Sequence, residues 1–232
     1  MRHILIVFSI FLFSFTIISC AKKSSDDSSS TTDDANTTKD SIYENFNDNT
    51  INENLWKIDN EDKQLVKEVD SQLSIVNSST ENENNCCAYL YLKEGGYREI
   101  QVDIKIDSWS SPSNASLFWY PWNNSELVHL GFASEESSNT ITTFAQIWSE
   151  KEQTIYLKRF GTASLNSYYT FKMVWDGNSV FFFIDNVSKD SYSPPTNKKI
   201  LNSPNDIRIN SWRNENDNGS IKIYADNFYA NP

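Results

Sequence analysis

The sequence predicts an all-β protein, folded as a two-sheet antiparallel sandwich. Residues 97–107 alternate with a period of two, and Ile100, Val102, Ile104 and Ile106 share one face while polar residues occupy the other. Such alternation is typical of a strand with one solvated face. No segment has the 3.6-residue period of an amphipathic helix. Many short strands joined by polar turns favour a sandwich.

The other predicted strands are short runs with a less regular alternation. A hairpin is expected at Asp176 and Gly177, because Asp-Gly tolerates the positive φ angles of a tight turn. Its two flanking strands are therefore predicted to be antiparallel neighbours. In chain order the further strands cover residues 72–76, 88–92, 126–133, 140–148, 154–160, 169–175, 180–184, 206–212 and 220–229.

The first 19 residues are predicted to be a signal peptide. Arg2 provides a basic start, residues 4–18 are apolar, and Ser19 is a small residue before Cys20. This apolar run is shorter than the roughly 20 residues of a transmembrane helix and is followed by polar residues, which disfavours a signal anchor. An ordinary secretory signal remains an alternative, because Ile18 stands where a small residue is commoner.

The segment Ile17, Ile18, Ser19 and Cys20 resembles the lipobox of bacterial lipoproteins. This resemblance implies that Cys20 becomes the first mature residue and carries a diacylglyceryl group and an N-acyl chain such as palmitate. Several acyl chains together hold a protein stably on a membrane. Ala21, in place of Asp, resembles the pattern that permits transfer to the outer membrane in enteric bacteria. We therefore expect an exported protein, lipid-anchored in the bacterial envelope at the outer membrane or cell surface.

Three segments organise the chain. Residues 1–19 are the signal peptide, and residues 20–40 are the lipidated cysteine and a flexible tether rich in Ser, Thr and Asp. The tether contains no aromatic residue and no aliphatic residue larger than alanine, so it cannot bury a core. Residues 41–232 have the size of one β-rich domain and show no second linker or internal repeat.

Composition disfavours two kinds of partner. The chain has a net charge of −11, and removal of the signal peptide with Arg2 leaves 19 basic and 31 acidic residues, a net charge of −12. Nucleic acids and anionic lipid headgroups bind basic patches, so neither is an expected partner. Membrane contact is expected through the lipid anchor only.

The two remaining cysteines, Cys86 and Cys87, are adjacent. Neighbouring α-carbons lie about 3.8 Å apart, closer than the roughly 4.4–6.8 Å of bridged cysteines, so the sequence favours two half-buried thiols over a strained ring. Oxidation stays open as an alternative in an oxidising compartment. A zinc site is not expected, because the chain has no Cys-x-x-Cys pair and one of its two histidines lies in the signal peptide.

The order of several short phrases resembles the concanavalin A-like jelly roll, which occurs in legume-type lectins, laminin G-like modules and laminarinase-type β-glucanases. The resemblance spans nearly all of residues 41–232 and implies this fold for the domain. The phrases are an opening strand and tryptophan, a short second strand, a long strand, a hairpin and a closing strand, at residues 44–48 with 55–56, 72–75, 97–107, 169–186 and 225–228.

The hydrolases of this fold carry Glu-x-Asp-x-x-Glu on one strand, since a retaining glycosidase needs two carboxylates about 5–5.5 Å apart. The corresponding strand starts here at Glu126, but Val128 and Gly131 replace the second and third acids. A single carboxylate cannot support this mechanism, so no catalytic residue is assigned. A glycoside hydrolase with rearranged carboxylates is the alternative.

Aromatic residues with nearby polar groups are the candidates for a sugar-binding groove, because aromatic faces pack against sugar rings. For Trp119 and Trp148 a core position and a groove position are equally compatible with the pattern, whereas Trp122 is expected to be exposed. His129 shares a face with Leu127 and Gly131, so one interpretation is that it lines the concave sheet, and the alternative is a half-buried histidine with satisfied hydrogen bonds. The candidate ligand-binding residues are Trp119, Trp122, Glu126, His129 and Trp148.

Many jelly rolls of this type hold a structural calcium where the first and last strands meet. The resemblance implies Asp226 as its carboxylate ligand, with carbonyls of residues 45–48 completing the oxygen shell that calcium requires. The alternative is that Asp226 is a loop acid facing solvent.

Taken with the missing acids, the sandwich pattern predicts a surface-anchored, non-catalytic carbohydrate-binding or adhesion module whose partner is a glycan or polysaccharide. A second hypothesis is the hydrolase with rearranged carboxylates. A third is a structural lipoprotein without a sugar site, whose faces are covered by a protein partner.

Overall fold

The computed structural model describes residues 39–58, 65–78, 87–122, 126–134, 138–195, 207–213 and 219–232. The chain divides into two units, Met1–Thr37 and Thr38–Pro232, and all described residues belong to the second. Cys20 and most of the predicted tether therefore lie outside the described residues. Within the described ranges, no helix has the length and apolar character needed to cross a membrane.

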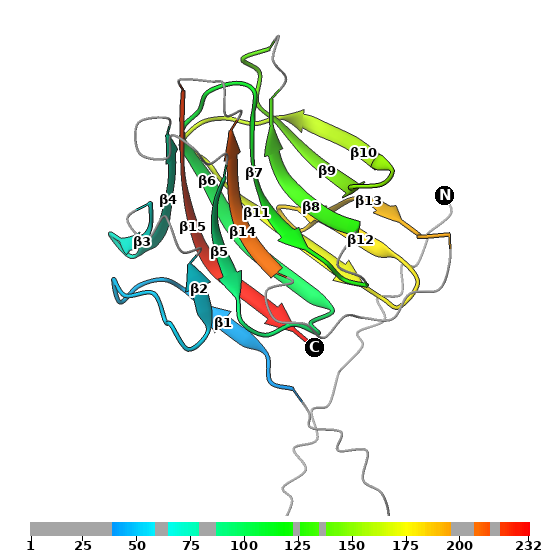
Figure 1. The fold of residues 1–232 in the computed structure, drawn as a ribbon, viewed down its shortest axis with the longest axis horizontal. Coiled ribbons are helices and arrows are strands. Elements are labelled where there is room, and N and C mark those ends of the chain that lie inside the picture. Colours follow the sequence, from blue (N-terminus) through cyan, green and yellow to red (C-terminus); the bar gives the residue numbers. More distant parts are fainter. Residues whose placement is uncertain are drawn as a thin grey trace, which may run out of the picture. The chain divides into compact units, whose positions relative to one another are not determined.

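The described residues form fifteen strands that pair antiparallel and stack as two layers (Figure 1). The predicted all-β fold is confirmed. The strands are β1 (Ile42–Glu44), β2 (Trp56–Ile58), β3 (Val66–Val69), β4 (Gln72–Ser78), β5 (Cys87–Leu92), β6 (Glu99–Ser108), β7 (Ser113–Trp119), β8 (Glu126–Ala133), β9 (Thr142–Ser149), β10 (Gln153–Thr162), β11 (Tyr168–Trp175), β12 (Val180–Ile184), β13 (Val187–Tyr192), β14 (Ile207–Arg213) and β15 (Ser220–Asn231).

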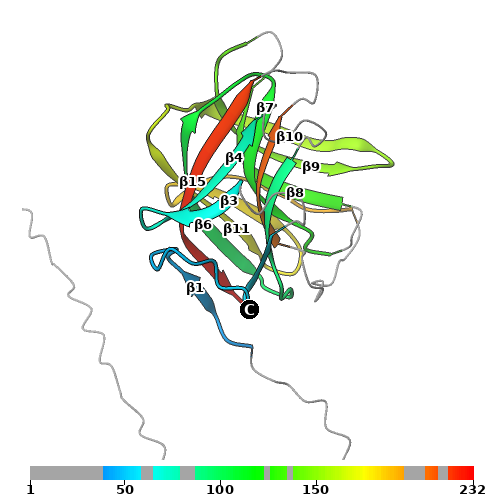
Figure 2. The same cartoon turned by 60° about the vertical axis from the view of Figure 1, so that its left-hand side comes forward.

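The two sheets have eight and seven strands. The eight-stranded sheet has the order β13-β12-β11-β6-β15-β4-β3, with β1 paired to β15, and the seven-stranded sheet has the order β10-β9-β8-β7-β14-β5-β2. Strands β4 and β15, far apart in sequence, lie side by side in Figure 2. Because β1 pairs with β15, the first described strand is hydrogen-bonded to the last one.

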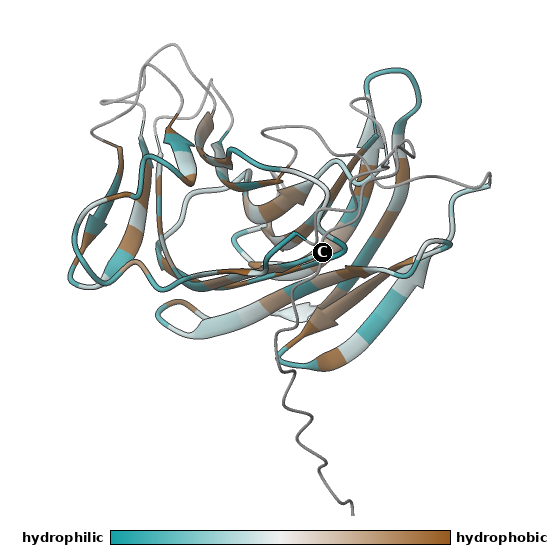
Figure 3. Ribbon diagram, turned by 90° about the horizontal axis from the view of Figure 1, so that it is seen from below, coloured by the Kyte–Doolittle hydropathy of each residue, from teal (hydrophilic) through white to brown (hydrophobic). Residues whose placement is uncertain are grey.

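The core lies between the sheets and follows the predicted alternation. In β6, Ile100, Val102, Ile104 and Ile106 are fully buried, and the residues between them are half-buried on the other face. Figure 3 shows hydrophobic and hydrophilic residues alternating along the strands. Burial of one face of each strand is the main stabilising contribution, because each fully buried aliphatic side chain contributes about 1.5–3 kcal/mol.

The predicted Asp-Gly hairpin joins β11 and β12. The two strands are antiparallel neighbours from Phe171 opposite Ile184 to Trp175 opposite Val180. Gly177 has a φ of 104°, a conformation that suits glycine. The carboxylate of Asp176 accepts hydrogen bonds from the backbone amides of Asn178 and Ser179, each 2.8 Å long, and these bonds lower its pKa. The turn residues therefore fix the register of this pair.

One polar link crosses the core between the sheets. Arg213 of β14 is completely buried, and its Nε donates a 3.1 Å hydrogen bond to Oδ1 of Asn77 in β4. The amide of Asn77 in turn donates a 3.0 Å hydrogen bond to the carbonyl of Ser211. A buried guanidinium requires such partners, because leaving its polar groups unpaired is costly. The link therefore joins the end of β14 to the opposite sheet.

Candidate functional site

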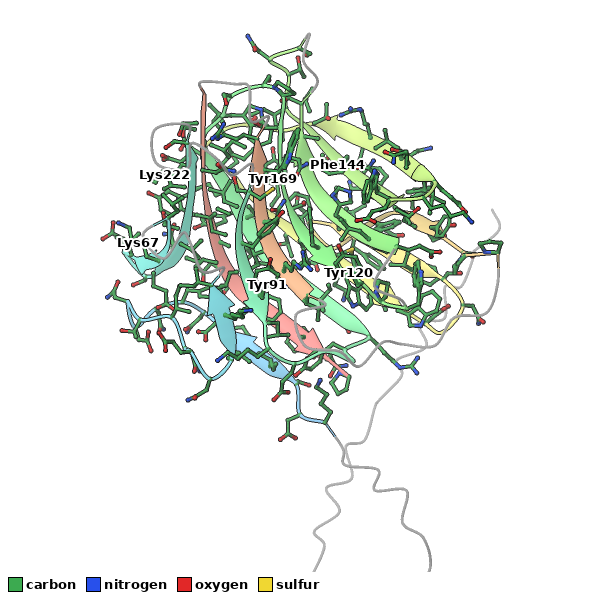
Figure 4. The ribbon with its side chains drawn as sticks, viewed as in Figure 1. Lys67, Tyr91, Tyr120, Phe144, Tyr169 and Lys222 are labelled. Carbon is green, nitrogen blue, oxygen red and sulfur yellow. The ribbon has the colours of Figure 1, made fainter. Side chains whose placement is uncertain are left out.

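The strand register arranges side chains in rows across the outer face of the seven-stranded sheet. Val128 and Leu130 of β8 point into the core, so the residues between them point outward. One row runs from β9 to β5 through Gln146, His129, Phe118, Arg208 and Tyr91. The next row consists of Phe144, Gly131, Ser116, Asn210 and Tyr89. Tyr91 and Phe144 are labelled in Figure 4.

A pocket of about 490 Å³ opens on this face, within the size range of small-ligand sites. Its apolar and aromatic lining consists of Tyr89, Phe118, Leu127, Trp148 and Trp212. Its other lining residues are Cys87, Asn114, His129, Gln146, Thr154 and Asn210. Among the described residues that line it there is no Asp, Glu, Lys or Arg. The lining thus combines aromatic surfaces with uncharged polar groups.

Gly131 belongs to the second of these rows and lies where β7 and β8 approach each other closely. A β-carbon at this position would lie 2.2 Å from the carbonyl oxygen of Ala115 and 2.5 Å from the α-carbon of Ser116. Only glycine fits such a close backbone approach. The position predicted to correspond to the third acid of the hydrolase motif therefore has no space for a side chain, and Val128, at the position of the second acid, is fully buried in the core.

His129 is a buried part of the pocket wall. It is 4% exposed, and its ring is packed edge-on between Phe118 and Phe144, with centroid distances of 4.8 and 5.0 Å. Burial lowers the pKa of His129 to about 3, because an imidazolium ion would lose its hydration there. Gln146 lies beside the ring and weakly favours the charged form, although the geometry does not make a hydrogen bond. The imidazole is neutral at physiological pH.

Several polar atoms near the pocket are buried without a hydrogen-bond partner. Both ring nitrogens of His129 and Oδ1 of Asn210 are in this state, as is the hydroxyl of Ser116. Asn210 is 1% exposed, and its Nδ2 donates a 3.2 Å hydrogen bond to Oδ1 of Asn114. A buried polar group without a partner costs about 1–3 kcal/mol. Groups of this kind in a pocket wall are suited to a ligand that supplies hydrogen bonds.

A cluster of three tyrosines and one arginine borders the pocket. The guanidinium of Arg208 lies 4.6 Å from the ring centroid of Tyr91, 5.0 Å from that of Tyr120 and 5.8 Å from that of Tyr89. These distances are those of cation–π interactions. Tyr89 is shared with the pocket lining, so the cluster extends the aromatic surface toward β5.

Two of the predicted ligand-binding tryptophans lie in the core instead. Trp119 is fully buried, and the expectation that Trp122 is exposed is wrong, because it is only 7% exposed. Its ring centroid lies 5.1 Å from that of Trp175, so the proline turn folds this side chain back onto the core. Glu126 lies two residues before Val128 and is therefore on the inward-facing side of β8. Its carboxylate accepts a hydrogen bond from Nε1 of Trp122, and it does not line the pocket.

His129 and Trp148 both lie on the outer face and line the pocket, which settles for Trp148 the choice between core and groove that the sequence left open. Asn210 and Trp212 also line the pocket and were not predicted as ligand-binding residues. They alternate with the buried Ile209 in β14, so their common face was readable from the pattern. The pattern does not reveal that this face carries a pocket.

The expectation of a free thiol at Cys87 is wrong. Cys87 is 6% exposed, forms a disulfide bond and lines the pocket beside Trp212, its register partner on β14. The other cysteines of the chain lie outside the described residues. The disulfide is therefore part of one wall of the site.

The calcium site predicted at Asp226 stays a prediction, since one carboxylate and backbone carbonyls were expected to form it. Asp226 lies opposite Asp103, whose two oxygens accept hydrogen bonds from Thr170 (2.6 Å) and from the side chain of Asn227 (3.0 Å). The backbone amide of Asn227 also donates to Asp226 (2.7 Å). In the described part of the chain no three His, Cys, Asp or Glu residues are grouped to hold a metal ion. Half-burial raises the pKa of Asp226, and Asp103 adds to this effect.

The two sheets and the pocket on one outer face define a jelly-roll sandwich of the glucanase type, as the concanavalin A-like resemblance implied. No family model and no curated protein matches the sequence. Among solved structures, a laminarinase from Flavobacterium sp. UMI-01 is similar, with a TM-score of 0.64 and 14% identity over 82% of this chain and 99% of that one. An endo-acting O-glycanase of the human gut microbiota has a TM-score of 0.63 and 10% identity, covering 82% and 97% of the two chains. SCLam, a non-specific endo-β-1,3(4)-glucanase of family GH16, has a TM-score of 0.62 and 12% identity, covering 82% and 89%. At these identities the similarity shows the fold.

Proposed function

We propose that this protein is a non-catalytic glycan-binding module. The observation that carries the proposal is the pocket on the seven-stranded sheet, whose aromatic walls and uncharged polar groups suit a sugar ring. Glycoside hydrolysis by this fold requires paired carboxylates, and none of the described lining residues is an acid. Because the structurally similar proteins are glucanases and an O-glycanase, polysaccharides and O-glycans are the ligands to test first.

A hydrolase with rearranged carboxylates is the second candidate, and one observation favours it. Burial raises the pKa of the Tyr192 hydroxyl, and the carboxylates of Glu126 and Glu152 raise it further, so both acids act on one tyrosine. A glycosidase needs two carboxylates held at a defined separation. Neither acid lines the pocket, which is why we place this function second.

The experiment that separates the two functions measures binding and cleavage on the same purified protein. Laminarin, mixed-linkage β-glucan and mucin O-glycans are titrated calorimetrically, and the release of reducing ends is followed in parallel. We expect binding without release. Cleavage that is lost in both Glu126→Gln and Glu152→Gln variants would establish the hydrolase instead, and absence of binding to every glycan would favour the structural lipoprotein.

We further propose that the domain is displayed on the bacterial envelope through a lipid on Cys20. The support is the sequence of the signal peptide, since the residue lies outside the described ranges. Metabolic labelling with a palmitate analogue tests the proposal, with Cys20→Ala as the comparison. Label on the parent protein and its loss in the variant are expected, whereas an unlabelled parent protein would contradict lipidation.

A further inference from the structure

We infer that the pocket selects uncharged sugar units, and that His129 and Asn210 are the residues that impose this selection. The inference rests on the proposed function and adds the class of ligand to it. It combines two observations, which are the unpaired polar atoms of these two buried side chains and the uncharged lining around them.

His129 and Asn210 are both more than nine-tenths buried, and both line the pocket. They come from different strands, β8 and β14, with β7 between them. Their unpaired atoms are the two ring nitrogens of the imidazole and Oδ1 of the amide. These atoms have almost no accessible surface in the structure, so a ligand pairs with them only after the side chains around them move slightly. Such a ligand then satisfies polar groups that the protein itself leaves without partners.

The chemistry of these atoms matches hydroxyl groups. A neutral imidazole offers one donor and one acceptor, and the amide oxygen of Asn210 is an acceptor only. A sugar hydroxyl both donates and accepts, so it can pair with either residue. A carboxylate or sulfate group only accepts, and would therefore place its negative charge against the amide oxygen. An ammonium group only donates, and would leave the donor of His129 unpaired.

The surroundings keep His129 neutral. Phe118 of β7 and Phe144 and Gln146 of β9 face its ring, and none of these side chains titrates. Because burial lowers its pKa to about 3, His129 stays uncharged at the pH values of the binding experiments. An ionic ligand group would lose hydration in this pocket without meeting an opposite charge among the described lining residues.

Two tryptophans of the lining also favour sugar rings as ligands. Trp148 and Trp212 are half-buried, so part of each indole remains accessible in the pocket. Such surfaces pack against the C–H faces of sugars while hydroxyl groups at the ring edge reach polar side chains. Arg208 lies outside the lining, packed on its three tyrosines. It is a cation near the pocket, so the experiment must separate its influence.

The test compares three oligosaccharides of equal length on the full mature protein. Laminarihexaose is neutral, hexagalacturonate is acidic and chitosan hexamer is cationic below about pH 6, so all three are titrated calorimetrically at about pH 5.5. We expect the neutral oligosaccharide to bind at least about tenfold more tightly than either charged one. Tighter binding of hexagalacturonate would overturn the inference, and its loss in Arg208→Gln would assign that binding to the arginine cluster.

Two variants test the assigned residues separately. His129→Phe keeps an aromatic ring between Phe118 and Phe144 but removes both nitrogens, and Asn210→Leu keeps the volume but removes the amide. Each is expected to weaken laminarihexaose binding about tenfold or more, a change that corresponds to about 1.4 kcal/mol. Tyr168→Phe is the matched control, because it removes a single hydroxyl on the other sheet, where the tyrosine donates to Gln72.

Thermal unfolding of each variant shows whether it folds, and either variant alone suffices for the test. In the parent protein the affinity for laminarihexaose is expected to stay constant from pH 5 to pH 8. A change in affinity centred near pH 6.5 and absent in His129→Phe would overturn the neutral-imidazole argument. If laminarihexaose binds but neither variant weakens it, the proposed function stands and this inference fails; if no glycan binds, both fail.

Discussion

Replacement of Gly131 by alanine is expected to destabilise the domain strongly. The added β-carbon would lie 2.2 Å from the carbonyl oxygen of Ala115 and 2.5 Å from two carbons of Ser116, so β7 and β8 must separate. These contacts involve the backbone of two central strands, which side-chain rotation cannot relieve. Overpacking of a core typically costs about 1–3 kcal/mol, and we expect the upper end, about 3 kcal/mol, because backbone must move.

Urea unfolding followed by tryptophan fluorescence measures this effect. With a dependence on urea of about 2–3 kcal/mol/M, a loss of about 3 kcal/mol lowers the midpoint by about 1–1.5 M. Gly161→Ala is the control for the steric clash, because its β-carbon would meet nothing within 4 Å, and any loss of stability there comes from backbone strain at its φ of 152°. A midpoint for Gly131→Ala equal to that of the control would refute the argument that this site excludes side chains, and with it the structural reason for the missing acid.

Three further predictions concern binding and stability. Trp148→Ala should weaken glycan binding about tenfold in calorimetry with little change in stability, whereas Trp122→Ala should cost about 3 kcal/mol of unfolding free energy by cavity formation; equal effects on binding and stability in both variants would contradict the assignment. Burial and the nearby carboxylate of Asp48 raise the pKa of Glu68 from 4.5 to about 7. The folded state therefore holds this proton more tightly, so stability present below pH 4.5 is lost as the pH rises to 7. After allowance for screening, urea titrations at several pH values should show a loss of about 1–2 kcal/mol relative to Glu68→Gln, and parallel pH profiles would disprove it. Reduction of the Cys87 disulfide should lower glycan affinity, and unchanged calorimetric titrations in dithiothreitol would show that this wall does not contact the ligand.

The strands with one solvated face were predictable from the sequence. β12 coincides with its predicted range and β6 differs only at its ends, because alternation marks such strands directly. β8 also coincides with its predicted range, although its six central residues are all buried. β7 was not recognised as a strand, since most of its residues are buried on both faces and no alternation remains. β13 was missed for the opposite reason, because it is a polar edge strand with little apolar content.

The candidate site was predictable only in part. Alternation along a strand showed which residues share a face with His129 and which share one with Trp148, but it did not show whether the face of Trp148 is the core or the outer surface. It could not place Trp122, which follows a strand and is turned onto the core by the chain around Pro121. The participation of Asn210 and Trp212 depends on which strand lies beside β7, and strand order is a property of the whole fold rather than of any local segment.

The buried link through Asn77 bears on the kinetics of ligand capture. Ser211 and Arg213, which flank the pocket residue Trp212, are both hydrogen-bonded to this one asparagine of the opposite sheet. These two hydrogen bonds hold the end of β14 against the opposite sheet, which restricts movement of the segment that carries the indole. Association should accordingly proceed in one step, and stopped-flow traces should fit a single exponential whose rate rises linearly with ligand concentration.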